Sequence, residues 1–163
     1  MTESFKSLLP MLRRFAYSLT GSTFDADDLV QTTLERILDK GIPENIEVNK
    51  WAFTVCRNVW IDEYRAKKTR TAATERPELQ EVATVEDQQA IESNAHLTQV
   101  HHAMNTLPTD QRSILSMVAL QGLSYKDVSS ILSVPVGTVM SRLSRARSSL
   151  LEKVNSQQLG GQA

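Results

Sequence analysis

Hydrophobic side chains recur along most of this chain at the three- and four-residue steps that place them on one face of an α-helix. The first such stripe predicts a helix over about residues 5–19 that ends at Gly21, because a glycine commonly follows the last turn of a helix. Pro10 interrupts the stripe early, so the helix either begins near Pro10 or kinks there. The stripe contains Phe5, Leu8, Leu9, Leu12, Phe15, Ala16 and Leu19.

A second stripe predicts a helix that begins after Thr23 or Asp25 and ends at Gly41, with acidic residues in its first turn opposing the positive end of the helix dipole. Its expected buried side contains Ala26, Leu29, Val30, Thr33, Leu34, Ile37 and Leu38. A third helix is predicted from about Val48 to Arg70. Cations and two aromatic residues share this helix, a mixture typical of surfaces that hold single-stranded nucleic acid: Arg57, Trp60, Tyr64, Arg65, Lys67, Lys68 and Arg70.

The helical periodicity fades after Arg70 and resumes near Ala90. Pro108 is expected to end the helix that follows, and Thr109 to cap the next one, which runs to Gly122. Apolar residues of this last helix are expected to pack beneath the C-terminal part of the chain: Ile114, Leu115, Met117, Val118 and Leu120.

Residues 123–151 predict two short helices joined by a tight turn. Ser124, three residues before Asp127, is close to a capping box, and Pro135 disfavours continuation of the first helix while suiting the first turn of the second. The buried stripe of the second helix is Val139, Leu143, Ala146 and Leu150, and the opposite face carries Thr138, Ser141, Arg142, Arg145 and Ser149. Small hydroxyls followed by arginines on one face are typical of a helix-turn-helix recognition helix, which contacts base edges and phosphates.

The alternative for these two helices is a hairpin whose arginines are merely solvated. Two observations favour DNA binding: the Pro-Val-Gly turn, and the absence of any acidic residue between Asp127 and Glu152.

Composition limits the remaining classes of function. A chain of 163 residues with 40% hydrophobic content can form one or two packed domains but contains no apolar run of membrane-spanning length. Its first residues lack a secretory signal pattern, so we expect a cytoplasmic protein without membrane insertion. Cys56 is the only cysteine, the three histidines do not share one helical face, and no catalytic motif is present. We therefore expect no enzyme activity, no cofactor and no metal site.

Charge is unevenly distributed along the chain. Residues 1–70 hold 11 basic and 10 acidic side chains, residues 71–97 hold one and six, and residues 98–163 hold six and three. Neutral to basic ends separated by an acidic segment suit two DNA-facing domains that a DNA-repelling linker holds apart.

The motifs resemble a known family. The run LSYKDVSSILSVPVGTVMSRLSRAR, with the preceding LPTDQRSIL, resembles the fourth conserved region of bacterial RNA polymerase sigma factors of the extracytoplasmic-function (ECF) group. DADDLVQTTLERIL and NKWAFTVCRNVWIDEYRAKK resemble parts of the second conserved region. The resemblance implies an all-α protein with a sigma region 2-like domain (1–70), an acidic linker (71–92), a helix-turn-helix sigma region 4-like domain (93–155) and a disordered tail (156–163).

The resemblance also implies roles for particular residues. The promoter's −35 element would be read by Thr138, Ser141, Arg142 and Arg145. The −10 element would be recognised and opened by Asn58, Asp62, Arg65, Lys67 and Lys68, with the loop over about residues 41–49 cradling a flipped base. The core RNA polymerase, through its largest-subunit coiled coil and its flap, would be bound in part by Asp28, Gln31 and Glu35. An anti-sigma factor is a further implied partner.

Two other functions fit parts of the sequence. A stand-alone helix-turn-helix regulator would bind duplex DNA without polymerase but would leave the segments over 25–38 and 51–70 unexplained. A sigma-like decoy would sequester an anti-sigma factor without binding DNA, and the arginines retained on the recognition helix argue against it.

Overall fold

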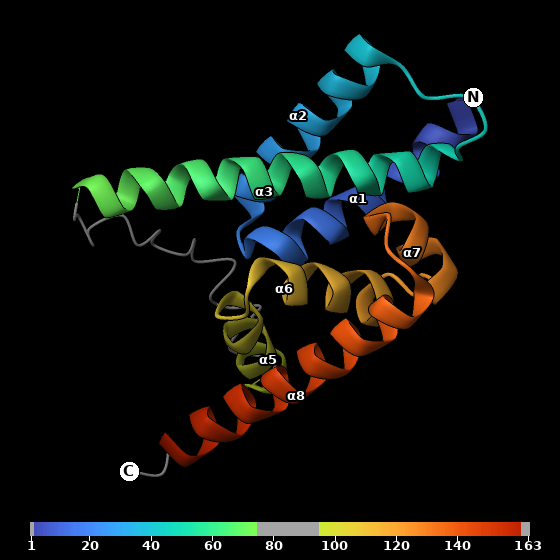
Figure 1. Ribbon diagram of the computed structural model, residues 1–163. Coiled ribbons are helices and arrows are strands. Elements are labelled where there is room, and N and C mark those ends of the chain that lie inside the picture. Colours follow the sequence, from blue (N-terminus) through green and yellow to red (C-terminus); the bar gives the residue numbers. More distant parts are fainter. Residues whose placement is uncertain (1, 75–94, 161–163) are drawn as a thin grey trace.

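The computed structural model describes residues 2–74 and 95–160, and every regular element in these two ranges is a helix (Figure 1). The N-terminal range contains α1 (Thr2–Thr20), α2 (Thr23–Lys40) and α3 (Val48–Thr74). The C-terminal range contains α5 (Ala95–Asn105), α6 (Thr109–Leu115), the π-helical turn η1 (Ser116–Leu120), α7 (Tyr125–Leu132) and α8 (Val136–Gly160). The all-helical architecture expected from the periodicity is confirmed for these residues.

The first three helices pack against one another around the predicted apolar stripes. Helix α1 continues through Pro10, which rules out the first of the two alternatives, a helix that begins near Pro10. Phe15 and Phe53 meet edge to face with their ring centroids 4.9 Å apart and centre the core of this bundle. Gly21 ends α1 with a positive φ of 76°, and Ser22, one residue before the predicted start, caps α2 by accepting a hydrogen bond from the Asp25 N–H at 3.3 Å.

Three predictions for α2 and α3 need correction. Leu38 was expected on the buried side of α2, but its side chain is 79% exposed, while the preceding Ile37 is the residue of that turn that packs into the core. Trp60, expected on a nucleic-acid surface, is buried in the core, and the guanidinium of Arg112 lies 6.0 Å from its ring centroid. Helix α3 is also longer than expected and runs to Thr74.

The C-terminal helices form a second layer, with α8 against α5, α6 and α7. Thr109 does not cap α6, whose preceding residue Pro108 makes no side-chain cap hydrogen bond. The helix widens into the π-helical turn η1, and the chain then turns at Gly122, whose φ is 67°. Leu120, the last residue of η1, is 59% exposed rather than packed.

The prediction placed the start of the C-terminal tail too early in the sequence. Helix α8 continues to Gly160, whereas fraying was expected from residue 156. The segment before Gly160 contains no proline or glycine that would stop an established helix. Lys153, one turn earlier, donates from Nζ to the Thr106 carbonyl oxygen at 2.7 Å and ties α8 to the C-terminal end of α5.

The two helical layers pack directly against each other, contrary to the expectation that they stand apart. Helix α7 contacts α3, and η1 and α5 contact α1, so one apolar cluster runs through both layers (Figure 1). Buried Arg112 joins them by donating from Nε to the Ser18 carbonyl oxygen at 2.9 Å, while the Ser18 and Ser116 hydroxyls are hydrogen-bonded to each other. The central part of the expected linker, residues 75–92, lies outside the described residues.

Candidate nucleic-acid and polymerase interfaces

The helix-turn-helix has the local structure that the sequence predicts. The Ser124 hydroxyl accepts from the Asp127 N–H at 3.1 Å, which caps α7. Ser133 turns the chain in the left-handed region at φ 55°. The Pro135 carbonyl then accepts from the N–H of Thr138 at 3.0 Å and of Val139 at 3.2 Å, so Pro135 stands at the start of α8 as predicted.

Helix α8 buries one face and exposes the other. The predicted stripe residues Val139, Leu143 and Ala146 are buried and Leu150 packs on the edge of the core. On the opposite face Ser141 and Arg145 are exposed, and Thr138 and Arg142 are half-buried. The Ser141 hydroxyl donates to the Gly137 carbonyl at 3.1 Å, which leaves its oxygen free to accept. This geometry presents hydroxyls and guanidinium groups outwards, as reading a DNA groove requires.

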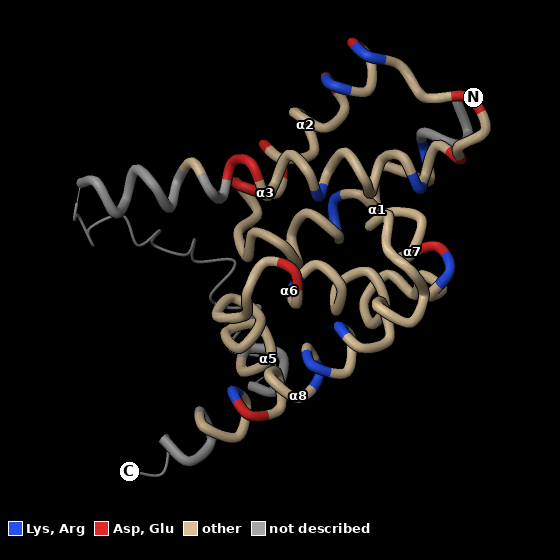
Figure 2. The backbone as a smooth tube through the Cα atoms, viewed as in Figure 1, with Lys and Arg blue, Asp and Glu red and all other residues tan. Residues whose placement is uncertain are grey.

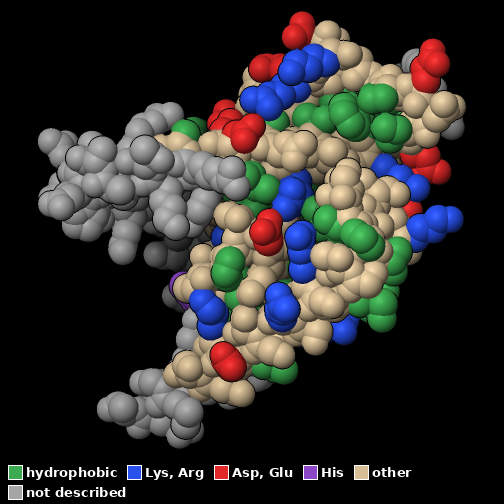
Figure 3. Space-filling view, viewed as in Figure 1, with side chains coloured by type: hydrophobic (Ala, Val, Ile, Leu, Met, Phe, Trp, Pro, Cys, Tyr) green, Lys and Arg blue, Asp and Glu red, His purple; other side chains and the backbone are tan. Residues whose placement is uncertain are grey.

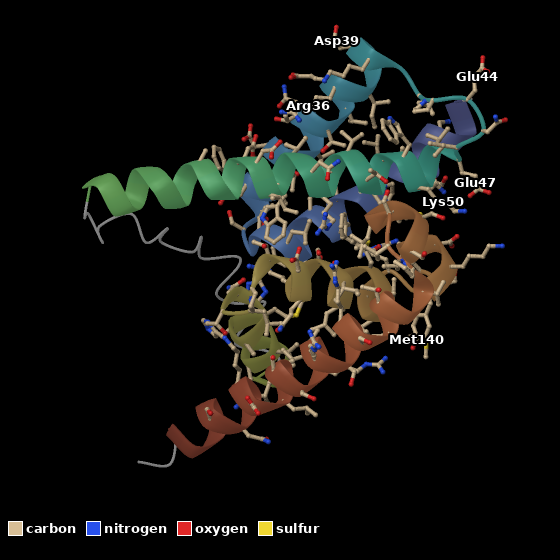
Figure 4. All side chains as sticks on the ribbon, viewed as in Figure 1. Arg36, Asp39, Glu44, Glu47, Lys50 and Met140 are labelled. Carbon is tan, nitrogen blue, oxygen red and sulfur yellow. The ribbon has the colours of Figure 1, made fainter. Side chains whose placement is uncertain are left out.

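Sequence reasoning missed Met140 on the same helix. Its side chain is 53% exposed and extends away from the body of the protein in Figure 4. An exposed apolar side chain beside Ser141 can pack on a thymine methyl group. The available signal was an apolar residue next to, and not part of, the stripe through Val139 and Leu143.

Two of the candidate −10 residues lie on the exposed side of α3. Asn58 and Asp62, one helical turn apart, are both exposed. Arg65, Lys67 and Lys68 continue the same helix, and their side chains lie outside the described part of the structure.

The loop before α3 faces α7 across a cavity of about 370 Å³. Trp51, half-buried as the stripe predicts, lines this cavity with Asn45, Ile46, Glu47, Lys50, Thr54, Ser130, Ile131 and Ser133. Lys50 Nζ lies 3.0 Å from Asp127 Oδ1, and Figure 4 shows Glu47 and Lys50 at the end of α3 that lies beside α7. This ion pair lowers the pKa of Asp127 and raises that of Lys50, mainly through their shared hydrogen bond.

The candidate polymerase-binding residues share one face of α2. Asp28, Gln31 and Glu35 are exposed, and Gln31 Nε2 lies 3.4 Å from Glu35 Oε1. Phe24 and Leu38, each 79% exposed, extend this face at both ends. The five residues follow one another at steps of four, three, four and three, which is the spacing of a coiled-coil contact seam. We call these five residues the α2 seam. Sequence reasoning missed its two apolar ends, because Leu38 was assigned to the core and Phe24 lies before the apolar stripe that begins at Ala26.

Comparison with known proteins places this arrangement in a family. The sigma-70 region 2 family matches residues 5–70 and the sigma-70 region 4 family matches residues 97–150. The chain is 34% identical over 152 residues to the ECF RNA polymerase sigma factor EcfG of Rhodopseudomonas palustris, a match that covers 92% of this chain and 82% of EcfG. The chain belongs to the ECF RNA polymerase sigma factors.

Two further relatives agree with this membership. The sigma factor SigC of Mycobacterium tuberculosis is 33% identical over 141 residues, which cover 83% of this chain and 74% of SigC. The sigma factor RpoE of Bartonella quintana, solved in complex with the anti-sigma factor NepR, superimposes with a TM-score of 0.71 and 26% identity over 94% of this chain and 96% of RpoE.

As an ECF sigma factor, the chain directs promoter-specific transcription initiation and is not an enzyme, and members of its family bind RNA polymerase and promoter DNA. A match to both regions favours this function over a stand-alone regulator, which would leave region 2 unexplained. Among the described residues, no helix of this sigma factor is both long enough and apolar enough to span a bilayer.

Proposed function

We propose that this sigma factor divides promoter recognition between its two layers, with residues 1–70 binding polymerase and opening the −10 DNA and residues 93–155 holding the −35 duplex. The observation that carries the proposal is the outer face of α8, where Ser141 and Arg145 are exposed while Val139 and Leu143 are buried beneath them. The acidic segment 71–92 joins the two parts. We place the protein in the cytoplasm, where polymerase and promoter are found.

At the −35 element we assign Thr138 and Ser141 to base edges in the first turns of α8, and Arg142 and Arg145 to bases or phosphates further along. A recognition helix contacts bases with its N-terminal residues, and the exposed hydroxyl of Ser141 lies there. A guanidinium that reads a guanine should contribute about 1–3 kcal/mol at one base pair, whereas a phosphate contact weakens all sequences equally.

At the −10 element we assign Asn58 and Asp62 to the DNA-facing side of α3, continued by Arg65, Lys67 and Lys68. The exposure of Asn58 and Asp62, one helical turn apart, supports the assignment of these two residues. The cavity between the preceding loop and α7 is the candidate pocket for a flipped base, whose extrusion costs a few kcal/mol that a fitted pocket can offset.

For polymerase binding we assign the α2 seam, centred on Asp28, Gln31 and Glu35, to the coiled coil of the largest subunit. Its 4-3-4-3 spacing suits a helical partner, and the exposed Phe24 and Leu38 supply apolar surface that three polar side chains lack. The polymerase flap is the proposed partner of the C-terminal domain. An anti-sigma factor is a further proposed partner, supported by the likeness to RpoE, which was solved with NepR.

Transcription from a genomic DNA library by reconstituted holoenzyme, with start sites mapped, tests these assignments. We expect start sites preceded by shared −10 and −35 sequences. Arg142→Ala should relax the preference at one −35 base pair, with Arg147→Ala, an exposed arginine of the same helix, as the matched control. If Arg142→Ala weakens all promoters equally, Arg142 contacts a phosphate; if core polymerase does not retain the protein, the proposed division of labour fails.

A further inference from the structure

The first two turns of α8 carry exposed apolar side chains at positions where a merely solvated helix would carry polar ones. Val136, the first residue of the helix, is 41% exposed, and Met140 is 53% exposed. Neither side chain belongs to the apolar cluster that holds the fold together. The two residues are four positions apart, so they are neighbours on the helix surface. We call this pair the apolar strip of α8.

The surface around the apolar strip is uncharged. Residues 128–141 contain no Lys, Arg, Asp or Glu, and the charges of α8 begin at Arg142. Figure 2 shows this separation, because α8 is tan beside α7 and carries blue positions further along. In Figure 3, Lys and Arg side chains likewise lie over the later part of α8. Without a cation, the first turns of α8 contribute little to phosphate binding, which leaves their side chains to contact base edges.

The space beside the apolar strip is open. Gly137 lies one turn before Ser141 and presents no side chain, and a Cβ built on it would meet no other atom of the protein within 4 Å. Base edges can therefore approach the helix closely at this point. Among the groups that base pairs present in the major groove, the C5-methyl group of thymine is the apolar one. An exposed apolar side chain on a recognition helix therefore has a preferred target there.

We propose that Met140, together with Val136, recognises thymine in the −35 element by packing on its C5-methyl group. This inference deepens the −35 role given to α8 above and rests on it. Thr138 and Ser141 then supply hydrogen bonds to base edges, while the apolar strip favours base pairs that present a methyl group. Four residues of α-helix rise about 6 Å, close to the height of two base pairs, so the thymines involved should lie in neighbouring base pairs.

Replacing single thymines by deoxyuridine tests this contact, because the change removes the methyl group and keeps every hydrogen-bonding atom of the base. The mapped promoter is made as a synthetic duplex, and each thymine of its −35 element is replaced in turn on either strand. The dissociation constant is measured for the complex with reconstituted holoenzyme. For the wild type we expect about fourfold weaker binding at one or two neighbouring base pairs, the loss that corresponds to one buried methyl group. A deoxyuridine in the spacer is the control template.

Substitutions of Met140 assign the effect to the apolar strip. Met140→Gln keeps the length of the side chain but makes its end polar, so the thymine and uracil templates should bind this variant with nearly equal affinity. Met140→Leu should keep the preference for thymine. Leu151→Gln, at a position of α8 that is 63% exposed, is the matched control and should show the wild-type ratio. Because each variant is compared with itself on two templates, a general loss of affinity cancels.

Two outcomes overturn the proposal: no thymine of the −35 element is sensitive to the replacement, or Met140→Gln keeps the wild-type ratio. A scrambled −35 element separates these outcomes from a failure of the proposed function. If scrambling leaves the affinity unchanged, the −35 role of α8 fails and this inference fails with it. If scrambling weakens binding while every uracil template binds as its thymine counterpart does, the −35 role stands and only the recognition of the methyl group is refuted.

Discussion

Leu38→Ala offers the sharpest test of the α2 seam because the substitution removes apolar surface that the protein's own fold does not use. Leu38 is 79% exposed at the C-terminal end of the seam. An exposed large side chain adds little to the stability of the free protein, so we expect the free energy of unfolding to change by no more than about 0.5 kcal/mol. Any large effect must then arise in a complex.

The size of that effect follows from the area available. Complete burial of a leucine side chain contributes about 1.5–3 kcal/mol, and nearly four-fifths of the Leu38 surface is free to be buried by a partner. Alanine keeps the β-carbon, so the expected loss on binding is about 1–2 kcal/mol. This corresponds to a dissociation constant for core polymerase that is roughly 5- to 30-fold larger.

The assay is a titration of labelled core polymerase with the wild type, Leu38→Ala and Leu151→Ala. Leu151 is 63% exposed on α8, away from α2, and serves as the matched control. We expect weaker binding for Leu38→Ala alone, with the helical content and the unfolding midpoint of the free chain unchanged. A change of less than about twofold would refute the view that a helical partner packs along the seam.

Two further predictions concern the interface between the layers. Arg112→Met should lower the free energy of unfolding by about 3–5 kcal/mol, measured by urea unfolding followed by circular dichroism. The substitution removes charged hydrogen bonds to the Ser18 carbonyl and to Asn105 from a side chain that is only 5% exposed. Arg147→Met, at an exposed position, is the control and should cost less than about 0.5 kcal/mol, and a loss below about 1 kcal/mol for Arg112→Met would contradict this account. Burial is the main reason why the pKa of His101 lies below its ordinary value of 6.5. The neutral side chain therefore contributes its full stability above pH 6.5, and this contribution is lost as the pH falls through the lower pKa of the folded state. Unfolding free energy should therefore fall between about pH 7.5 and about pH 5 less steeply in His101→Gln than in the wild type, and equal slopes would show that His101 does not carry the effect.

Local structure was predictable because its causes are local. The stripe through Val139, Leu143 and Ala146 is buried as the periodicity predicts, and Ser124 and Pro135 delimit the two helices of the turn. The same holds for the exposed position of Asp28, Gln31 and Glu35. Each of these features depends on helical spacing, on a capping side chain or on the fixed φ of proline, all of which the sequence displays directly.

The errors arose where a position depends on a distant segment. Leu38 continues the apolar spacing of α2, but in the last turn of that helix the bundle covers Ile37 and leaves Leu38 exposed. Trp60 was expected beside cations on a nucleic-acid surface, and is instead covered by Arg112, which lies 52 positions later in the chain. Periodicity reports which face of a helix is apolar and not which partner will reach it.

Charge was the least decisive signal, because some cations of α3 are paired within the chain. Arg57 adds to the cationic pattern that predicts nucleic-acid binding, yet it pairs with Asp110 of the other layer. Lys50, which lies before that pattern on α3, likewise pairs with Asp127. A cation selected to hold a phosphate also suits an aspartate of its own chain, because both partners present anionic oxygens to the same donors. A count of basic residues therefore overestimates the cationic surface of α3, because it leaves out the acidic residues of α6 and α7 that pair with Arg57 and Lys50.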